Sequence, residues 1–310
     1  MKIIITGAAG LVGQNLIPRL KQRGHLQIVG IDKHSANTAM LRKLHPDIEV
    51  IEADLAQDGG GWKDALRGCD VLFHNHAQIG ALTYEPFYAN NVVATRNVLT
   101  AARAAKVPYM VHTSSSVVNS MANDFYTASK KEQEKIALEC GIACCVLRPT
   151  LMFGWFDRKH LGWLARFMKR VPVFPIPGDG RYLRQPLYVG DFCEVVISAI
   201  ERPRPGEIHN ISGQTKIDYI DLMREVRAAN GAKAVIVKIP YVAFRLLLET
   251  YARLDANPPF TSRQLEALVA PDVFEVIDWP AIFGVSSTPL RKALTETFQH
   301  PVYSQVALEF

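Results

Sequence analysis

The stretch "TGAAGLVG", residues 6–13, decides the fold. It follows the apolar run "KIIIT" (2–6) and opens a segment with helical periodicity that extends to about Arg23. Gly7 permits a tight turn, Gly10 lets the backbone approach a pyrophosphate, and Gly13 lets the helix pack closely on the strand. The N-terminus of that helix, at Leu11 and Val12, offers backbone N–H groups to phosphates. The stretch therefore predicts a strand–turn–helix unit that binds a dinucleotide.

An acidic residue stands where such a unit needs one. Asp32 ends the next apolar run, "LQIVGID" (26–32), nineteen residues after Gly13. A carboxylate there can accept hydrogen bonds from both ribose hydroxyls of an adenosine, and it repels a 2′-phosphate. This favours NAD over NADP. Lys33 and His34 are cationic groups that could tolerate the phosphate, so NADP stays open as the less favoured cofactor.

The rest of the first half repeats the same alternation. Apolar runs at 48–54, 70–76, 108–114 and 143–149 alternate with helical patterns, notably at 90–105 and 124–140. Fully apolar strands that alternate with helices indicate a parallel sheet covered on both faces. The predicted fold class is α/β, a doubly wound parallel sheet of the Rossmann type.

The character of the chain changes after Pro149. Proline and glycine become dense, and shorter helices are expected at about 191–201, 217–229, 241–254, 261–270 and 288–298. We expect a dinucleotide-binding domain over 1–150 and a smaller substrate-binding lobe over 151–310. The lobe is interleaved with the first domain, and part of it returns to the main sheet.

Composition excludes several classes of protein. The 310 residues are 48% hydrophobic and 21% charged, with a net charge of +5 and with Lys and Arg spread along the chain, so no nucleic-acid partner is predicted. No apolar window reaches about 18 residues, so no membrane span is expected. The N-terminus reads as a strand and not as a signal peptide. Five cysteines without a metal-ligand spacing favour reduced thiols in a cytoplasmic protein and no metal site, and His74 and His76 lack a third ligand.

Tyr126 and Lys130 in "YTASK" (126–130) lie at i and i+4, which places both on one face of a helix. An ammonium group beside a phenol is expected to lower the pKa of the phenol, so that Tyr126 can exchange a proton with an alcohol. A nicotinamide would exchange the hydride on the same carbon. Ser114 and Ser115 follow the preceding strand and point in opposite directions, so only one of them can face the substrate oxygen.

These motifs together resemble the extended short-chain dehydrogenase/reductase family, the group of nucleotide-sugar epimerases, dehydratases and reductases. The resemblance covers nearly the whole chain, through "TGAAGLVG", "EADL", "FHNHA", "NNVVATRNVL", "VHTSSS", "YTASK", "LRPTLMFG" and "RQPLYVGDF". It implies that Ser115 and Tyr126 are catalytic and that Lys130 is both catalytic and a ligand of the nicotinamide ribose. It also implies a structural role for Asn91.

The expected cofactor site combines the glycine loop with later strand ends. Asp54 is placed to reach the adenine edge, and the backbone of "HNHAQ" (74–78) to pass the pyrophosphate and ribose. The resemblance adds the backbone near Pro149–Leu151 beside the nicotinamide amide. The predicted cofactor-binding residues are Gly7, Gly10, Leu11, Val12, Gly13, Asp32, Asp54, Leu55, His74, Ala77, Tyr126, Lys130 and Pro149.

Two departures from the family pattern affect substrate preference. Ten residues separate Ser115 from Tyr126, where sugar-modifying relatives usually carry a longer loop, and Asn119–Ser120 replaces a common Tyr–Gly. Ser116 and Val117 stand where dehydratases carry an Asp–Glu pair, so a dehydratase is set aside. Epimerase and reductase or dehydrogenase chemistry both stay open.

Arg184, in "GDGRYLRQPLYVGDF" (178–192), occupies the position from which nucleotide-sugar enzymes of this family bind the substrate diphosphate. Arg181 stands close by, and Arg158 and Lys159 are weaker candidates. The predicted substrate is a nucleotide diphosphate sugar, contacted by Ser115 and Arg184.

The C-terminal half supports two alternatives. Its apolar helix at 240–254 resembles the tail of the group related to the NADH-dehydrogenase accessory subunit, which implies a non-catalytic dinucleotide-binding subunit. The same helix could also border a pocket for a steroid-like or lipid-like alcohol. The resemblance further implies a homodimer through the helices at 90–105 and 124–140.

Overall fold

The computed structural model describes all residues except 123, 255–264, 266–268, 270–273, 307 and 309–310. Its main sheet has seven parallel strands in the order β11-β6-β5-β4-β1-β2-β3. These strands are β1 (Lys2–Thr6), β2 (Gln27–Asp32), β3 (Glu49–Glu52), β4 (Val71–His74), β5 (Tyr109–Thr113), β6 (Ala143–Pro149) and β11 (Ile208–Ile211). The order reverses at β1, which makes the fold doubly wound, and the predicted Rossmann-type fold class is confirmed.

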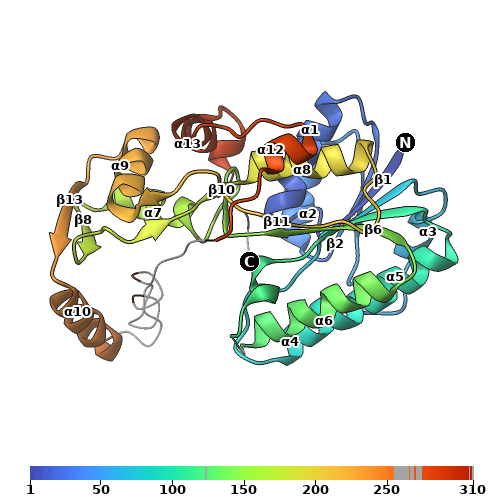
Figure 1. Ribbon diagram of the computed structural model, residues 1–310, viewed down its shortest axis with the longest axis horizontal. Helices are drawn as coiled ribbons and strands as arrows, with labels where there is room; N and C mark the ends of the chain where they lie inside the picture. The colour runs from blue at the N-terminus through green and yellow to red at the C-terminus, as the bar shows by residue number, and fades with distance from the viewer. Residues whose placement is uncertain (123, 255–264, 266–268, 270–273, 307, 309–310) are drawn as a thin grey trace.

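Helices cover both faces of this sheet, as Figure 1 shows. One layer contains α1 (Leu11–Gln22) and α8 (Val189–Glu201), and the other contains α5 (Ala94–Ala104) and α6 (Phe125–Glu139). Alternate side chains of each strand enter different cores: Ile3 and Ile5 pack with α1 and α8, whereas Ile4 packs with α5 and α6. Two buried faces explain why the strands are apolar at nearly every position.

The chain after residue 150 builds the lobe and also returns to the sheet. β11 pairs in parallel with β6, with Ile208 opposite Val146, and α8 packs on α1. Three two-stranded sheets lie outside the main sheet and pair β7 with β10, β9 with β12, and β8 with β13. Their strands are β7 (Met152–Phe153), β8 (Val173–Pro177), β9 (Leu183–Arg184), β10 (Leu187–Tyr188), β12 (Ile217–Asp218) and β13 (Val235–Ile239). The domain boundary at residue 150 stays a prediction.

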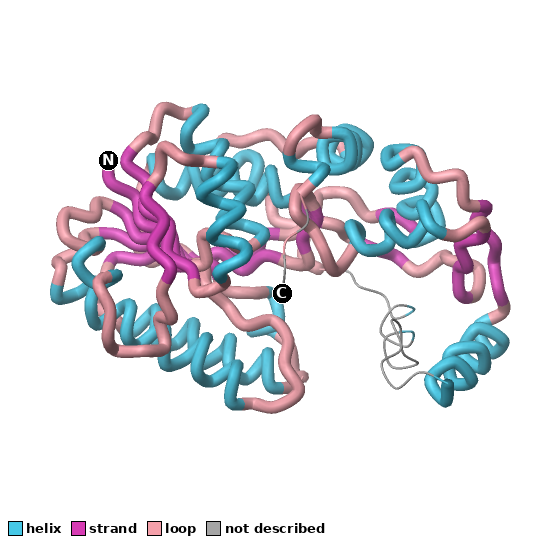
Figure 2. The backbone as a smooth tube through the Cα atoms, turned by 180° about the vertical axis from the view of Figure 1, so that it is seen from behind, coloured by secondary structure: helices cyan, strands magenta, loops and turns pink. Residues whose placement is uncertain are grey.

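The remaining helices are short or belong to the lobe. They are α2 (Ser35–Leu44), α3 (Trp62–Ala65), α4 (Glu85–Phe87), α7 (Leu161–Arg170), α9 (Tyr219–Asn230), α10 (Tyr241–Leu254), α12 (Trp279–Phe283) and α13 (Leu290–Gln299). Two 3₁₀ turns add η2 (Ser116–Asn119) and η3 (Tyr303–Gln305), and a π-helix forms η1 (Tyr88–Val93). α10, β8 and β13 lie at the end of the molecule farthest from the main sheet (Figures 1 and 2).

Several helices differ from the sequence-based expectations. The predicted helix at 90–105 is a continuous segment in which the π-helix η1 leads into α5. α7 and α12 were not predicted. The predicted helix at 261–270 lies outside the described residues, apart from Leu265 and Val269. Within the described part of the chain, no helix has the length and apolar character needed to cross a bilayer.

Candidate active site

The glycine loop packs so tightly that two of its residues leave no room for a side chain. Gly7 has a φ of +67°, and a β-carbon there would lie 2.8 Å from Cα of His76. A β-carbon on Gly13 would lie 2.4 Å from the carbonyl oxygen of Ala8. At Gly10 the nearest atom would be the carbonyl oxygen of Gly7, at 3.4 Å, so this position is open. As expected, Gly7 makes the tight turn, Gly10 leaves the backbone accessible, and Gly13 allows the close packing of helix and loop.

The N-terminus of α1 fits the diphosphate of a dinucleotide. Gly10 is its N-cap, no side chain of the described residues caps it, and its first turn contains no acidic residue. The first N–H groups of a helix lack partners within the helix and attract anions. The backbone at Leu11, Val12 and Gly13 can therefore hold phosphate oxygens of NAD.

Asp32 lies at the carboxyl end of β2, beside the glycine loop. Its Oδ2 accepts a hydrogen bond from the Ala9 N–H at 3.0 Å, and its Oδ1 accepts one from the His34 N–H at 3.1 Å. Burial raises the pKa of Asp32 more than these hydrogen bonds lower it. Lys33 turns away, with Nζ 2.6 Å from Asn90 Oδ1 and 3.7 Å from Asp54 Oδ2. The cation is thus paired with the Asp54 carboxylate.

Tyr126 lies in the first turn of α6, which the side chain of Asp124 initiates. Asp124 Oδ1 accepts a hydrogen bond from the Thr127 N–H at 3.0 Å. The Ser115 hydroxyl lies close enough to the Tyr126 phenol to lower its pKa. Burial raises the pKa of Tyr126, the Ser115 contact lowers it, and the net shift is upward. A hydroxyl pair at the ends of β5 and α6 can share a proton with one substrate oxygen.

Lys130 is buried one turn further along α6, with 1% of its surface exposed. Its Nζ donates hydrogen bonds to the Thr113 carbonyl oxygen at 3.0 Å and to Gln133 Oε1 at 2.5 Å. Burial lowers the pKa of Lys130 to about 7, although the Glu134 carboxylate opposes the shift. The Gln133 amide continues the network, because its Nε2 donates to the His76 carbonyl oxygen at 3.2 Å.

This arrangement corrects one expectation about the Tyr–Lys pair. The pKa of Tyr126 was expected to be lowered by the Lys130 ammonium, but it is raised. The reason is that burial of the phenol dominates, while the ammonium is bound to Thr113 and Gln133. Only the Ser115 contact favours the phenolate here.

The two neighbouring serines have different surroundings. The Ser114 hydroxyl lies against the Glu134 carboxylate, which also accepts hydrogen bonds from Arg148 at 2.9 and 2.5 Å. Burial raises the pKa of Glu134, but the Arg148 and Ser114 contacts outweigh it and the pKa is lowered. Ser114 therefore lies beside the structural ion pair of Glu134 on α6 and Arg148 on β6. Ser115 instead faces Tyr126.

Three histidines lie beneath Lys130. His74 and His112 are fully buried, with their Nδ1 atoms 2.7 Å apart, and His76 Nδ1 lies 3.0 Å from the Thr6 hydroxyl. Burial and the Lys130 charge lower the pKa of all three, that of His76 to about 3. No group of metal-ligating side chains occurs among the described residues. The His74 side chain is fully buried against His112, so only its backbone can border a ligand.

Other predicted cofactor residues lie on the same edge of the sheet. Ala77 is exposed in the loop after β4, and Asn91 fixes that loop by accepting the Gln78 N–H at 2.6 Å and donating to the Ser129 hydroxyl at 2.9 Å. Pro149 is buried at the end of β6. Leu55 is also buried, after β3.

The predicted substrate residues lie in the lobe. Arg184 is half-buried on β9, with its guanidinium 5.4 Å from the ring centre of Tyr182, which stacks on Tyr219 at 5.1 Å. Arg181 is an ion-pair partner of Asp218 at 2.6 Å.

The two weaker candidates lie between α7 and the preceding turn. Arg158 donates to the Leu308 carbonyl oxygen at 2.8 Å, and Lys159 has its pKa lowered, mainly by burial. Of these four cations, Arg184 is the one that lies over an aromatic ring, that of Tyr182.

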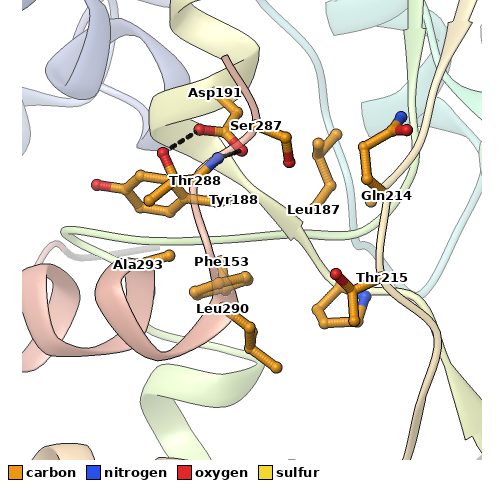
Figure 3. A pocket seen from close by; sticks show the side chains of 12 residues that line it. Phe153, Leu187, Tyr188, Asp191, Gln214, Thr215, Ser287, Thr288, Leu290 and Ala293 are labelled. Carbon is orange, nitrogen blue, oxygen red and sulfur yellow. Dashed lines mark hydrogen bonds between the residues drawn. The ribbon is translucent and has the colours of Figure 1, made fainter. Parts of the chain in front are cut away.

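A small pocket lies where the lobe meets α8 and α13 (Figure 3). Its volume is about 20 Å³, room for a water molecule but not for a nicotinamide or a sugar. Asp191 closes it by accepting hydrogen bonds from the Thr288 N–H at 2.9 Å and the Thr288 hydroxyl at 2.5 Å, as the dashed lines in Figure 3 mark. We assign it a structural role in joining the last part of the chain to α8.

Sequence reasoning missed Gln133 and the Thr113 carbonyl. Gln133 stands three residues after Lys130, on the same helical face, which is the available signal. A polar residue on the buried face of a helix requires a partner, and the Lys130 ammonium is that partner.

Comparison with known proteins identifies the family and agrees with the fold. Residues 3–212 match the model of the NAD dependent epimerase/dehydratase family. A 2-alkyl-3-oxoalkanoate reductase of Stenotrophomonas maltophilia is 29% identical over 87% of this chain and 90% of that protein. A 4-hydroxy-2-methyl-3-oxo-4-farnesyl-3,4-dihydroquinoline-1-oxide ketoreductase of Stigmatella aurantiaca is 27% identical over 79% and 78%. The crystal structure of a UDP-glucuronic acid 4-epimerase from Bacillus cereus with NAD superposes with a TM-score of 0.74, at 21% identity and over 97% and 98% of the two chains.

Proposed function

The chain belongs to the NAD dependent epimerase/dehydratase family and is an NAD-dependent enzyme, and from this premise we propose that Ser115, Tyr126 and Lys130 carry out its hydride-transfer chemistry on an alcohol or ketone. The observation that carries the proposal is the proximity of the Ser115 hydroxyl to the Tyr126 phenol, one helical turn from the buried Lys130. When bound, NAD accepts or donates the hydride at the reacting carbon.

The residues of the chain would supply the proton and hold the reacting oxygen. Tyr126 accepts or donates the alcohol proton, and Ser115 donates a hydrogen bond to the same oxygen. Lys130 places its Nζ beside them, in a position fixed by hydrogen bonds to Thr113 and Gln133. The glycine loop, Asp32 and the strand ends named above would bind the dinucleotide.

We propose a nucleotide diphosphate sugar as the substrate, bound through Arg184. A planar guanidinium suits phosphate oxygens, and Arg184 projects from β9 beside stacked aromatic rings. The hydride can be returned to either face of a keto sugar, or the keto sugar can be released. Epimerase and reductase chemistry therefore remain two versions of this proposal.

Two measurements test this function. One sample of the protein is denatured to release any bound cofactor. A native sample is mixed with a panel of nucleotide sugars while NADH absorbance is followed. Tightly bound NAD without net turnover, together with an epimerised sugar, identifies an epimerase. A net change in NADH identifies a dehydrogenase or reductase. Bound dinucleotide without any reaction, unchanged by Tyr126→Phe, would instead support the non-catalytic subunit.

Arg184→Ala is expected to weaken the binding of a uridine or thymidine diphosphate and to spare NAD. Loss of a charge-assisted hydrogen bond costs about 1.5–3 kcal/mol, which is roughly a 10- to 150-fold loss of affinity. Calorimetric titration of both ligands measures the difference. Arg181→Ala is the matched control, because Arg181 is paired with Asp218. Equal diphosphate affinity of wild type and Arg184→Ala would contradict the nucleotide-sugar proposal.

A second candidate substrate is a hydrophobic ketone or alcohol. The names of the two curated relatives above describe reductases of farnesyl-bearing and alkyl-bearing ketones. The short segment between Ser115 and Tyr126 leaves fewer side chains over the site mouth to define a sugar. Turnover of a 2-alkyl-3-oxoalkanoate with NADH, and none of any nucleotide sugar, would establish this candidate.

We further propose that Asp32 makes NAD the preferred cofactor over NADP. Its carboxylate already lies on the glycine loop, and the Lys33 ammonium is engaged with Asn90 and Asp54. Titration with both dinucleotides should give tighter NAD binding, and Asp32→Ala should narrow the gap. Tighter binding of NADP by the wild-type protein would overturn this assignment.

The quaternary structure and compartment are also proposals. We propose a homodimer through α5 and α6, whose outer surface carries a groove of about 220 Å³ lined by Arg96, Leu99, Thr100, Arg103, Ile136, Glu139 and Cys140. Light scattering of wild type and Thr100→Glu, at an exposed position of this groove, tests it. All five cysteines are buried free thiols, which supports a reducing, cytoplasmic location. Fractionation of cells that produce the protein tests the compartment.

A further inference from the structure

One end of the lobe exposes an apolar surface that is independent of the active site. This end, here called the lobe tip, comprises residues 166–178 and 231–250 and includes β8, β13 and the first ten residues of α10 (Figures 1 and 2). Val235 pairs with Val173 across the two strands. These two valines are 58% and 46% exposed, and Val237 on the same face is 39% exposed. The opposite face carries Phe174 and Ile176, which are buried in the lobe core.

α10, which follows β13 in the chain, also exposes apolar side chains. Val242, Leu246 and Leu247 are 76%, 63% and 60% exposed. At about 100° per residue they lie with Ala243 and Thr250 on a single arc of roughly 140°. A surface helix normally turns its polar residues outward. Here four of the five residues on the arc are aliphatic, which favours a partner that accepts apolar side chains.

The lobe tip is also the source of the positive charge of the chain. It contains six basic residues and one acidic residue, Glu249, which is a net +5 and equals the net charge of the whole chain. Outside the lobe tip the numbers of basic and acidic residues are therefore equal, although Lys and Arg are spread along the whole sequence. Five of the six cations have exposed side chains, namely Lys169, Arg170, Lys233, Lys238 and Arg245. Arg245 forms an ion pair with Glu249 at 2.7 Å.

We propose that the lobe tip docks on the surface of an anionic lipid bilayer, with Val242, Leu246 and Leu247 of α10 inserted at the boundary of headgroups and acyl chains. An apolar arc flanked by cations is the pattern of helices that lie in the membrane interface. Anionic lipids attract such basic segments, and the two contributions add.

The two observations together disfavour other partners. A second copy of the chain would bring a second tip of charge +5 against the first, and like charges repel. A nucleic acid would use the cations but would leave the aliphatic arc exposed to water. An anionic bilayer satisfies both the charge and the apolar surface.

Co-sedimentation of the full chain with lipid vesicles tests the proposal. Binding is expected to vesicles of phosphatidylcholine mixed with phosphatidylglycerol, to be weak with phosphatidylcholine alone, and to fall as salt is added. The double variant Leu246→Glu/Leu247→Glu should lower the partition coefficient more than about tenfold. Lys233→Gln and Lys238→Gln should each lower it about fivefold.

Controls distinguish docking through the lobe tip from misfolding and from nonspecific hydrophobic binding. Leu26→Glu changes a leucine that is 68% exposed outside the lobe tip, and it should bind vesicles as the wild type does. Every variant should keep its affinity for NAD, because the glycine loop is distant in the fold and unchanged. The proposal is overturned if the wild type does not bind, if it binds neutral vesicles equally well, or if the leucine variant still binds. It is also overturned if the leucine variant only abolishes self-association of the protein.

Discussion

Ser114 and Ser115 follow the same strand, but their hydroxyl groups have different surroundings. Ser115 lies beside the Tyr126 phenol, and Ser114 lies beside the Glu134 carboxylate that pairs with Arg148. Side chains alternate along extended backbone, so the two positions exchange roles if the strand shifts by one residue. Single substitutions at these two positions therefore test the assignment of the active site.

Ser115→Ala is expected to lower turnover about 10- to 1000-fold, because it removes one oriented hydrogen bond to the reacting oxygen. Ser114→Ala is the matched control and should change turnover less than about threefold while costing about 1 kcal/mol of folding stability. Tyr126→Phe in parallel sets the lower limit of activity. Steady-state kinetics and urea unfolding give both quantities. A larger loss of turnover in Ser114→Ala would place the other serine at the substrate.

The proximity of the candidate catalytic residues Tyr126 and Lys130 could be predicted from sequence because their spacing is local, whereas their electrostatics could not. A lysine at i+4 from a tyrosine predicts proximity, but the direction of its ammonium depends on acceptors elsewhere in the chain. Here the Thr113 carbonyl and Gln133 take it. The pKa of Tyr126 then depends on burial, which only the packed structure reveals.

Among the elements, α1 depends most directly on the sequence of its first turn. The helix comes so close to the loop that a β-carbon on Gly13 would clash with the Ala8 carbonyl oxygen, whereas one on Gly10 would make only an ordinary contact of 3.4 Å with the Gly7 carbonyl oxygen. Packing therefore constrains Gly13, and we predict that the dinucleotide constrains Gly10. The two glycines can be separated by experiment.

Gly13→Ala is expected to destabilise the fold by about 1–3 kcal/mol, the usual cost of overpacking a well-packed site. Gly10→Ala should keep the folding stability within about 0.5 kcal/mol, as a surface position does. It should nevertheless weaken NAD binding, because its methyl group stands where the backbone must approach a phosphate. Thermal unfolding and NAD titration of both variants check this. Equal stability of the two variants would show that α1 can move away from the loop.

Element positions were predictable where hydrophobic periodicity was strong, and were missed elsewhere. The six strands expected in the first half all form within a few residues of their predicted bounds. The π-helix at Tyr88–Val93 was not predicted, because Asn91 widens that turn through hydrogen bonds to the distant loop after β4. The seventh strand, β11, pairs with β6 although the paired residues lie 62 positions apart in the sequence, and no local pattern reveals this pairing.

At the scale of the whole molecule, buried bases link stability to pH. His74, His76 and His112 have pKa values lowered by burial from 6.5, so the unfolded chain binds up to three more protons as the pH falls below 6.5. The pKa of Lys130 is lowered from 10.5 to about 7 in the folded protein. Between these two pH values the unfolded chain therefore binds one more proton than the folded protein. In both windows stability rises with pH.

These three histidines contribute a slope of up to about 4 kcal/mol per pH unit below pH 6.5, and Lys130 contributes about 1.4 kcal/mol per unit between pH 7 and 10. Urea unfolding at several pH values from about 5 to 9 measures it. Lys130→Met should flatten the alkaline part and leave the acidic part steep. Stability that does not change between pH 5 and 6.5 would mean that the histidines are hydrated in the native state.

The contact between His74 and His112 has a spectroscopic consequence. Two neutral imidazoles with Nδ1 atoms 2.7 Å apart can share only one proton, so one ring must be the Nδ1–H tautomer and the other the Nε2–H tautomer. A proton enclosed in this way should give a downfield NMR resonance that exchanges slowly with water. His112 precedes Thr113, whose carbonyl anchors Lys130. The chemical shift of that single proton should therefore report on the charge of the lysine, without any label at the reaction centre.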